Sequence, residues 1–223
     1  MSTPSLYLQT AFILNNNGRI ISTREPDARG GPAFLLVRST TMSAWAVRVD
    51  LPQNLNHELD NLARQEPPVL NFRGAPLYAD RYVALVGGKI ESGPAFIFPD
   101  TLDRSTDIMF IDDLRLLSRN FREWTTGEIP ERSPISAILH EEHAVSVCFC
   151  ARRSEVAAEA GLETAAAFRG HGFGPRVTAA WALAIRASKR IPLYSTSWKN
   201  EASLAVACKL GLIAYASIWS LSG

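Results

Sequence analysis

The segment that most constrains this chain is AFRGHGFGPRVTAAWALAIRAS, residues 167–188, in which glycines on alternate positions precede an apolar pattern of helical period. Gly170, Gly172 and Gly174 are followed by Pro175. A helix tolerates proline in its first turn, because the N–H that proline lacks has no intrahelical partner there. The apolar residues that follow recur on one helix face and are Phe173, Val177, Trp181, Ala184 and Ile185. The segment predicts a glycine turn that leads into a helix.

The start of such a helix is suited to binding an anion. Its first four N–H groups lack intrahelical partners, and the helix dipole adds partial positive charge. Glycines let a phosphate approach these groups, because they carry no side chain and accept unusual dihedral angles. We therefore predict a phosphate cradle at residues 169–174. Two alternatives stay open: glycines that serve packing alone, and a dinucleotide site, although its spacing is G-x-G-x-x-G and not G-x-G-x-G.

Composition limits the possible partners. The 223 residues include 23 basic and 22 acidic ones, so no overall field attracts nucleic acid or an anionic membrane. Apolar residues make up 47% and charged residues 20%, which is usual for a globular protein and argues against disorder. No apolar run approaches the roughly 20 residues that cross a bilayer, and the N-terminus lacks the basic start of a secretory signal. We expect a soluble, cytoplasmic protein.

The cysteines and histidines give no sign of a metal centre. Three cysteines are an odd number, and Cys148 and Cys150 stand two apart, which on a strand places both on one face. We interpret them as reduced core side chains and keep a redox pair as the alternative. His140 and His143 lie in a predicted hairpin turn without a second pair of ligands. We expect no metal.

The pattern along the chain predicts two parts. Residues 1–100 are strand-rich, with one short helix marked by Leu55, Leu59 and Leu62, and form a domain of unknown role. Residues 101–223 form the second domain, for which we predict a mixed sheet with helices packed on it, an α/β fold. Its expected elements are a helix over 112–124, strands over 134–141, 144–153 and 155–165, the helix after the glycines, a strand over 191–197, a helix from Asn200 and a strand over 211–222.

Three motifs in the second part resemble one family. The segment RGHGFG at 169–174 matches the Q/R-x-x-G-x-G/A acyl-CoA signature of the GNAT superfamily of N-acyltransferases, and it stands between a strand and a long helix as in that family. SWKNEASLAVACKLGL at 197–212 is similar to its N-x-x-S/A…K-L-G-F segment, and LET at 162–164 to its L-x-V. PLYSTSW with Asn200 resembles bacterial GNAT acetyltransferases. The resemblance covers about residues 130–215.

The resemblance implies roles in binding acetyl-CoA as cosubstrate. The strand backbone at Leu162, Glu163 and Thr164 would pair with the pantetheine arm, and the N–H of Leu162 would stabilise the oxyanion. Asn200 and Ser203 would contact the pantetheine or acyl region, with a helix N-cap as the other explanation for Asn200. The pyrophosphate would lie on the six cradle residues, which are Arg169, Gly170, His171, Gly172, Phe173 and Gly174.

The reaction also needs a base, because an amine with a pKa of about 10.4 is mostly protonated near neutral pH. Glu159 occupies the strand position from which many family members draw a carboxylate base, although it could be a surface carboxylate. Glu163 lies on the same side of a regular strand and is the second candidate. The family's usual tyrosine acid is replaced by Ala207, which leaves the acid unassigned, with Ser203 or Tyr215 acting through water.

The chain ends just after the strand over 211–222, which we count as the family's sixth, whereas the family usually has a seventh. Either that strand is absent, or the N-terminal half supplies edge pairing through FILNNNGRII or RYVALV, or a second copy does so in a homodimer. The leading hypothesis is acetyl transfer to a primary amine in a ternary complex. An acyl-CoA-binding sensor or interaction module is the alternative, and a structural protein with accidental glycines is a third. The acceptor is unidentified, and RNFREWTTGEIPER at 119–132 is the segment expected to line its pocket.

Overall fold

The computed structural model describes residues 3–27 and 29–222, which form two compact units. Of the described residues, the first unit comprises 3–27, 29–96, 195–204 and 214–222, and the second comprises 97–194 and 205–213. The two short C-terminal segments of the first unit lie in the part of the sequence that we assigned to a domain over 101–223. The division at residue 100 stays a prediction.

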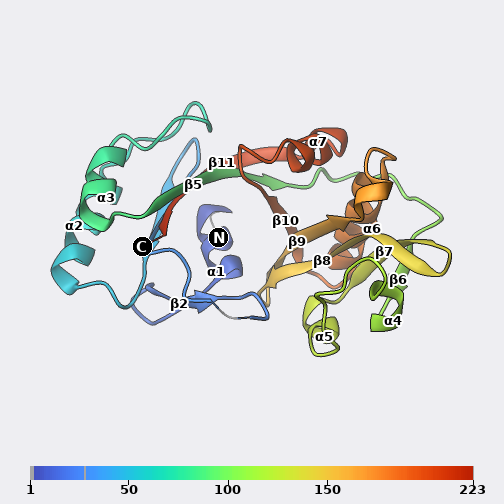
Figure 1. The fold of residues 1–223 in the computed structure, drawn as a ribbon. Coiled ribbons are helices and arrows are strands. Elements are labelled where there is room, and N and C mark those ends of the chain that lie inside the picture. Colours follow the sequence, from blue (N-terminus) through green and yellow to red (C-terminus); the bar gives the residue numbers. More distant parts are fainter. Residues whose placement is uncertain (1–2, 28, 223) are drawn as a thin grey trace. The chain divides into compact units, whose positions relative to one another are not determined.

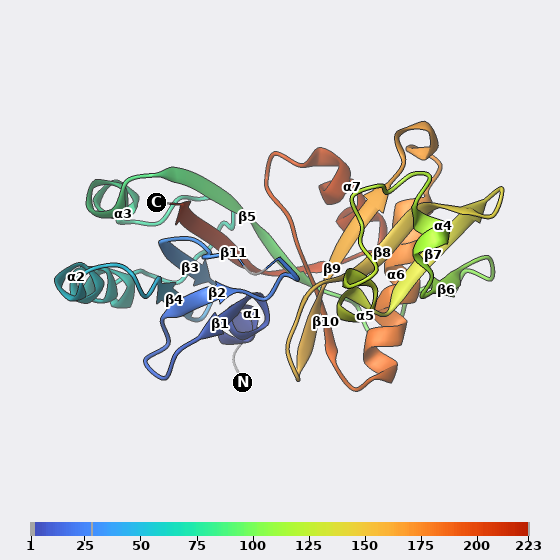
Figure 2. The same cartoon turned by 60° about the horizontal axis from the view of Figure 1, so that its bottom comes forward.

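A sheet of four strands forms the centre of the first unit, in the order β4-β3-β11-β5. Figure 1 labels β11 and β5, and Figure 2 labels all four strands. β11 pairs antiparallel with β3, with Trp219 opposite Leu36. The elements are α1 (Thr3–Ala11), β1 (Phe12–Leu14), β2 (Ile20–Thr23), β3 (Phe34–Arg38), β4 (Ser43–Val47), α2 (Gln53–Arg64), α3 (Ala79–Val86), β5 (Lys89–Ile97) and β11 (Ile213–Ser222). β1 and β2 form a separate hairpin.

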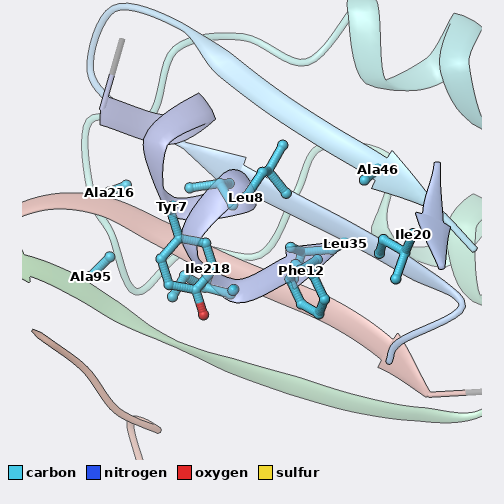
Figure 3. Close-up of a cluster of buried hydrophobic side chains, with 11 residues drawn as sticks. Tyr7, Leu8, Phe12, Ile20, Leu35, Ala46, Ala95, Ala216 and Ile218 are labelled. Atoms are coloured by element: carbon cyan, nitrogen blue, oxygen red, sulfur yellow. The ribbon is translucent and has the colours of Figure 1, made fainter. Parts of the chain in front are cut away.

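Both faces of this sheet are covered, because β3 is buried along its whole length. Phe34 and Leu36 face α2 and α3 in one core cluster with Trp219. Leu35 and Val37 face the other way, toward the cluster around α1 that Figure 3 shows with Tyr7 and Phe12. A strand apolar on both faces has no alternation of apolar and polar residues, which explains why the sequence pattern did not reveal it.

The second unit is built on the strand order β10-β9-β8-β7-β6 (Figure 2). Neighbouring strands pair antiparallel, except that β10 pairs parallel with β9. Its elements are β6 (Met109–Ile111), α4 (Leu114–Leu117), α5 (Glu128–Arg132), β7 (Ile135–His140), β8 (His143–Arg153), β9 (Ala157–Thr164), η1 (Ala166–Phe168), α6 (Phe173–Ala187) and β10 (Ile191–Ser195). α7 (Glu201–Lys209) begins in the first unit and ends in the second.

α6 covers one face of this sheet, and the segment that holds α4 and α5 covers the other. Cys148 and Cys150 are free thiols, and both are buried. They are core side chains, as predicted. On the opposite face, side chains of the α4–α5 segment pack against β8 in a core cluster. Its members include Leu117, Phe121, Trp124, Ile129, Val147 and Phe149.

The predicted α/β class with a mixed sheet is confirmed, as are the strands of the second half, the helix after the glycines and the helix from Asn200. Three expectations were wrong. The helix over 112–124 is only the single turn of α4, although its stripe of apolar residues is buried. RYVALV belongs to α3, whose helix ends at Gly87 with a φ of 72°. β3, not FILNNNGRII or RYVALV, pairs with the last strand.

The N-terminal half also contains more helix than expected, because α1 and α3 accompany α2. Within the described residues, no helix has the length and apolar character that spanning a bilayer requires.

Leu59 of α2 provides a test of the first unit's core. Its side chain is 0% exposed, so Leu59→Ala should lower the free energy of unfolding by about 2–5 kcal/mol through lost burial and a cavity. Leu70→Ala is the matched control, because Leu70 is 97% exposed, and it should change stability by less than about 0.5 kcal/mol. Urea unfolding followed by circular dichroism measures both. Equal losses would show that the core is placed wrongly.

Candidate functional site

The predicted cradle forms an open turn at the start of α6. Gly172 precedes the helix with a φ of 75°, and Gly170 has a φ of 83°, both in the left-handed region that favours glycine. A Cβ added to either residue would meet no atom within 4 Å, so the space above both is open. Gly174 differs, because its Cβ position lies 3.4 Å from side-chain atoms of Leu162 and Val206. The first two glycines shape the surface, and the third lets the helix pack.

Three consecutive amides of this turn donate no backbone hydrogen bond within the described part of the chain. Phe168 and Arg169 donate within the preceding turn, but Gly170, His171 and Gly172 donate to no backbone carbonyl among those residues. The side chain of Arg169 turns back to the carbonyl of Thr164, with 3.2 Å from Nε to oxygen. Consecutive free amides at a helix N-terminus with open space above them form a site that an anion fits.

A cation stands in the first turn of the same helix. Arg176 pairs with Asp107 and approaches the hydroxyl of Ser105 at 3.4 Å, while its guanidinium lies over the ring of Phe173. The hydrogen bond from Arg176 lowers the pKa of Asp107. An acidic residue therefore lies near the cradle, held by Arg176, which the sequence did not show.

The backbone of β9 directs alternate amides to its two edges. In an antiparallel ladder every second residue bonds to the neighbouring strand, and the residues between them direct N–H and C=O away from it. The amide of Ala165 donates to Val145 of β8 at 2.9 Å, so the odd-numbered residues at this end bond toward β8. The amide of Leu162 consequently faces the opposite edge.

β10 covers only the beginning of that opposite edge. It pairs through Ile191–Leu193 with Ala157–Glu159, and Ile191 donates to the carbonyl of Val156 at 3.0 Å, which fits the same alternation. Past Glu159, no strand pairing in the described chain uses this edge. The outward amide of Leu162 therefore lies beyond the end of the pairing with β10.

Glu159, Gly161 and Glu163 alternate along β9 and so share one face. Glu159 is 2% exposed and pairs with Arg152, with 2.7 Å between carboxylate oxygen and guanidinium nitrogen. At Gly161, a Cβ would lie 2.4 Å from the ring of Phe149, which stands opposite on β8. The ring thus occupies the position between the two carboxylates.

Glu163 has a different environment from Glu159, because it is exposed and forms no ion pair with another described residue, whereas Glu159 pairs with Arg152. Desolvation is the largest influence and raises the pKa of the Glu163 carboxyl. The indole of Trp124 and the charge of Arg132 act in the opposite direction, and Glu123 and Glu128 add to the increase. The net result is a carboxyl with a raised pKa at the surface, the property that suits a general base or acid.

Asn200 and Ser203, which we predicted to contact acetyl-CoA from the start of α7, belong to the first unit. The side chain of Asn200 accepts from the amide of Ser203 at 3.0 Å, so Asn200 caps the helix. The structure brings together the cradle, Leu162, Glu163 and Thr164 in the second unit, whereas Asn200 and Ser203 belong to the other. Ala207, at the position of the family's tyrosine, is buried, and Tyr215 packs at the edge of the first unit's core around α1.

His140 and His143 stand opposite each other across the β7–β8 turn. Within the described ranges, no group of three or more His, Cys, Asp or Glu residues is placed to hold a metal ion.

Three side chains of the site were not found from the sequence as site residues: Arg152, Trp124 and Phe149. Trp124 falls within the segment 119–132 that we expected near the acceptor, but no motif pairs it with Glu163. Arg152 and Phe149 reach β9 through strand pairing, with a register shift between Cys150 and Arg152. A bulge of this kind leaves little trace in a pattern of apolar residues.

Comparison with known families gives a direct match. Residues 117–216 match the family model described as GNAT acetyltransferase. This part of the chain belongs to the GNAT superfamily. No curated protein matches the chain significantly. The GNAT assignment supports acyl transfer as the class of reaction.

Solved GNAT structures are similar in fold but distant in sequence. An N-acetyltransferase-like protein from Streptococcus suis has a TM-score of 0.50 at 16% identity, over 86% of this chain and 84% of its own. An acetyltransferase from Colwellia psychrerythraea has a TM-score of 0.49 at 13% identity, over 80% of this chain and 76% of its own. A GNAT-family protein from Novosphingobium aromaticivorans has a TM-score of 0.49 at 15% identity. The match covers 60% of this chain and 66% of that protein, which is just under two thirds of its length. The Streptococcus suis structure supports the GNAT fold.

The contact between Gly161 and Phe149 predicts a coupled pair. Gly161→Ala should destabilise the protein by roughly 1–3 kcal/mol, because the new methyl group overlaps the ring. In a Phe149→Leu background, the same change should cost markedly less, since the ring is gone. Thermal unfolding of the four proteins measures the coupling. An equal cost of Gly161→Ala in both backgrounds would contradict the contact.

Proposed function

We propose that the protein is an N-acetyltransferase that moves the acetyl group of acetyl-CoA to a primary amine by direct attack in a ternary complex. The observation that carries the proposal is the combination, in one GNAT unit, of open amides at residues 170–172 with the outward amide of Leu162. The first set suits a pyrophosphate, and the second suits a thioester oxygen that gains charge.

In this proposal acetyl-CoA binds where Gly170 and Gly172 leave open space, because a Cβ at either residue would meet no atom within 4 Å. The pyrophosphate would bind the amides of the cradle, residues 169–174, and the pantetheine arm would lie along Leu162–Thr164, continuing the ladder where β10 stops pairing. Asn200 and Ser203 remain proposed contacts of the pantetheine or acyl region.

In the proposed reaction, the amine nitrogen attacks the thioester carbon, and its proton passes to a carboxylate. The C–N bond forms, and the oxyanion accepts a hydrogen bond from Leu162. The C–S bond then breaks, and CoA leaves as a thiolate that takes a proton from solvent. Proximity of the two substrates supplies much of the acceleration.

For the base we favour Glu163, with Glu159 as the alternative. A general base must be unprotonated near neutral pH so that it can accept the proton of the amine, and it must be able to reach the amine. Glu163 combines a raised pKa with exposure. Glu159 is buried and held by Arg152. Two carboxylates on one face with such different environments divide into a structural and a chemical role.

A second function is favoured by one observation, the buried Ala207 at the position of the family's tyrosine. Without that acid, the unit could bind acyl-CoA as a sensor or interaction module with little turnover. A thiol with a pKa of about 8.5 leaves readily as an anion, however, so the missing acid does not abolish transfer. Consumption of thioester with a panel of amines separates the two functions.

Acetyl-CoA binding tests the cradle. The wild-type protein should bind acetyl-CoA saturably in isothermal titration calorimetry, and Gly172→Asp should weaken binding at least about tenfold, because the carboxylate repels the pyrophosphate. Asparagine and aspartate tolerate a positive φ better than most residues, so the fold should persist.

Two controls separate charge from strain. Gly172→Asn adds similar bulk without charge and should lose less affinity. Gly18→Asp places the same side chain at a φ of 74°, also with no atom within 4 Å, in the first unit, and should bind as wild type. No saturable binding by the wild type, or equal affinity of Gly172→Asp, would reject the cradle.

The choice of base is tested by pH–rate profiles. Glu163→Gln should lower kcat by about 10²–10⁴-fold and remove the acidic limb, because activity falls as pH drops through the pKa of the base. Glu159→Gln should keep the limb but destabilise the protein by roughly 3 kcal/mol, since Arg152 loses its partner. Loss of the limb in Glu159→Gln with a normal profile in Glu163→Gln would reverse the assignment.

A further inference from the structure

We propose that Arg73 is a positioning residue: its guanidinium fixes the indole of Trp198 and, through it, the segment 196–203 that carries Asn200 and Ser203. This inference rests on the proposed function, because it takes Asn200 and Ser203 as contacts of the pantetheine or acyl region. Arg73 lies in the loop between α2 and α3, outside the part of the chain that matches the GNAT model. The loop and the segment both belong to the first unit, which thereby gains a task in the proposed reaction.

The contact between Arg73 and Trp198 is a cation over an aromatic ring. The central carbon of the guanidinium lies 4.4 Å from the centroid of the Trp198 ring, well inside the roughly 6 Å at which such an attraction is significant. Arg73 is exposed and forms no ion pair with another described residue, whereas Trp198 is half-buried. The indole is therefore the group on which the guanidinium rests.

The backbone that carries the indole is fixed against β5. The amide of Thr196 donates to the carbonyl of Pro94 at 3.3 Å, and the amide of Trp198 donates to the carbonyl of Ser92 at 3.1 Å. Gly93 stands between these two acceptors, and a Cβ there would overlap the carbonyl oxygen of Thr196. β5 thus needs a glycine at this position to let the segment approach, and the indole extends from a backbone that is held in place.

One short turn connects Trp198 to the two proposed ligand contacts. The hydroxyl of Ser197 accepts from the amide of Lys199 at 3.2 Å, and its carbonyl accepts from the amide of Asn200 at 3.0 Å. The side-chain oxygen of Asn200 then accepts from the amide of Ser203 at 3.0 Å. Because that oxygen is used by the cap, the side-chain nitrogen of Asn200 is the atom left to donate to a ligand carbonyl. A displacement of Trp198 reaches this donor through two residues of backbone.

The loop that carries Arg73 is itself tied down. The side chain of Asn71 accepts from the amide of Arg73 at 3.0 Å, and the carbonyl of Asn71 accepts from the amide of Gly74 at 3.0 Å. Arg38, at the end of β3 and 3% exposed, donates to the carbonyls of Gly74 and Ala75 at 2.5 and 3.2 Å. A buried cation thus holds the carbonyls that directly follow Arg73.

Glu66 holds the far end of the same loop. Its two carboxylate oxygens accept from the amides of Leu77 and Tyr78, at 2.9 and 3.0 Å. Glu66 is 8% exposed and lies 4.0 Å from Arg38, so the two buried charges compensate each other. Burying an ion pair is costly unless hydrogen bonds satisfy both partners, and here the loop backbone supplies those bonds. The pair therefore fixes the loop and with it the backbone of Arg73.

The stacking of Arg73 on Trp198 joins these two anchored segments. Without the guanidinium, the indole keeps its backbone bonds to β5 but loses the cation over its ring, and the turn that leads to Asn200 loses a constraint. The cradle at residues 169–174 lies in the second unit, so this loss should affect the pantetheine end of the ligand and not the phosphate end.

Amide hydrogen exchange of the full-length protein without acetyl-CoA tests the contact itself. Arg73→Ala should speed exchange in peptides that cover residues 196–203 and leave β3 and α2 as in the wild type. Arg73→Lys keeps a cation for the ring and should recover most of the protection. In a Trp198→Leu background, Arg73→Ala should cause no further change. Wild-type exchange of 196–203 in Arg73→Ala would overturn the inference.

Arg81→Ala is the matched control. Arg81 is exposed, lies on the neighbouring helix α3 and pairs with Glu58 at 3.2 Å, so the substitution removes the same side chain and charge from the first unit. It should leave the exchange of 196–203 unchanged. Equal acceleration in Arg81→Ala would show that the lost charge, and not the contact with Trp198, is responsible, and would contradict the inference.

Binding separates positioning from general damage to the protein. In isothermal titration calorimetry, Arg73→Ala should bind acetyl-CoA about two- to fivefold more weakly than the wild type does. Adenosine 3′,5′-bisphosphate carries phosphates but no pantetheine arm, so both proteins should bind it equally. Equal weakening for both probes, or unchanged affinity for acetyl-CoA, would contradict positioning. Absence of acetyl-CoA binding by the wild type would instead contradict the proposed function, and the exchange experiment would still decide whether Arg73 fixes the segment.

Discussion

Backbone N–H groups must find acceptors, and in the GNAT unit the strands and helices leave two sets of them without one. The cradle amides stand where α6 begins behind glycines, and the amide of Leu162 stands where β9 continues past the end of β10. Within this unit, both sets lie on the chain between Glu159, the last residue of β9 that pairs with β10, and the first turn of α6. An extended ligand with an anionic end and a polar carbonyl meets both requirements.

The side-chain chemistry follows from the alternation of β9, whose successive side chains point to opposite faces of the sheet. The outward amides belong to even-numbered residues, and the face with Glu159, Gly161 and Glu163 belongs to odd-numbered ones. Gly161 admits the Phe149 ring between two carboxylates, of which Glu159 is buried against Arg152 and Glu163 is exposed. The same strand thus carries the proposed oxyanion donor, Leu162, and the candidate base, Glu163, on adjacent residues.

Much of the second unit could be predicted, because its elements carry strong local signals. The glycines and Pro175 mark the start of α6, and alternation marks β7 and β8. The site was less predictable. Arg152 and Phe149 reach β9 only through strand pairing and a bulge. Trp124 comes from a segment distant in sequence, for which the apolar pattern predicted a longer helix than α4. β3 escaped notice because a strand buried on both faces has no period.

The central claim is that a ligand completes the hydrogen bonds of these two sets of amides, and amide hydrogen exchange tests it most directly. On addition of acetyl-CoA, peptides that cover residues 160–164 and 169–174 should slow their exchange together, while β3 and α2 of the first unit should not change. Protection absent from both segments, or confined to other parts of the chain, would contradict the account.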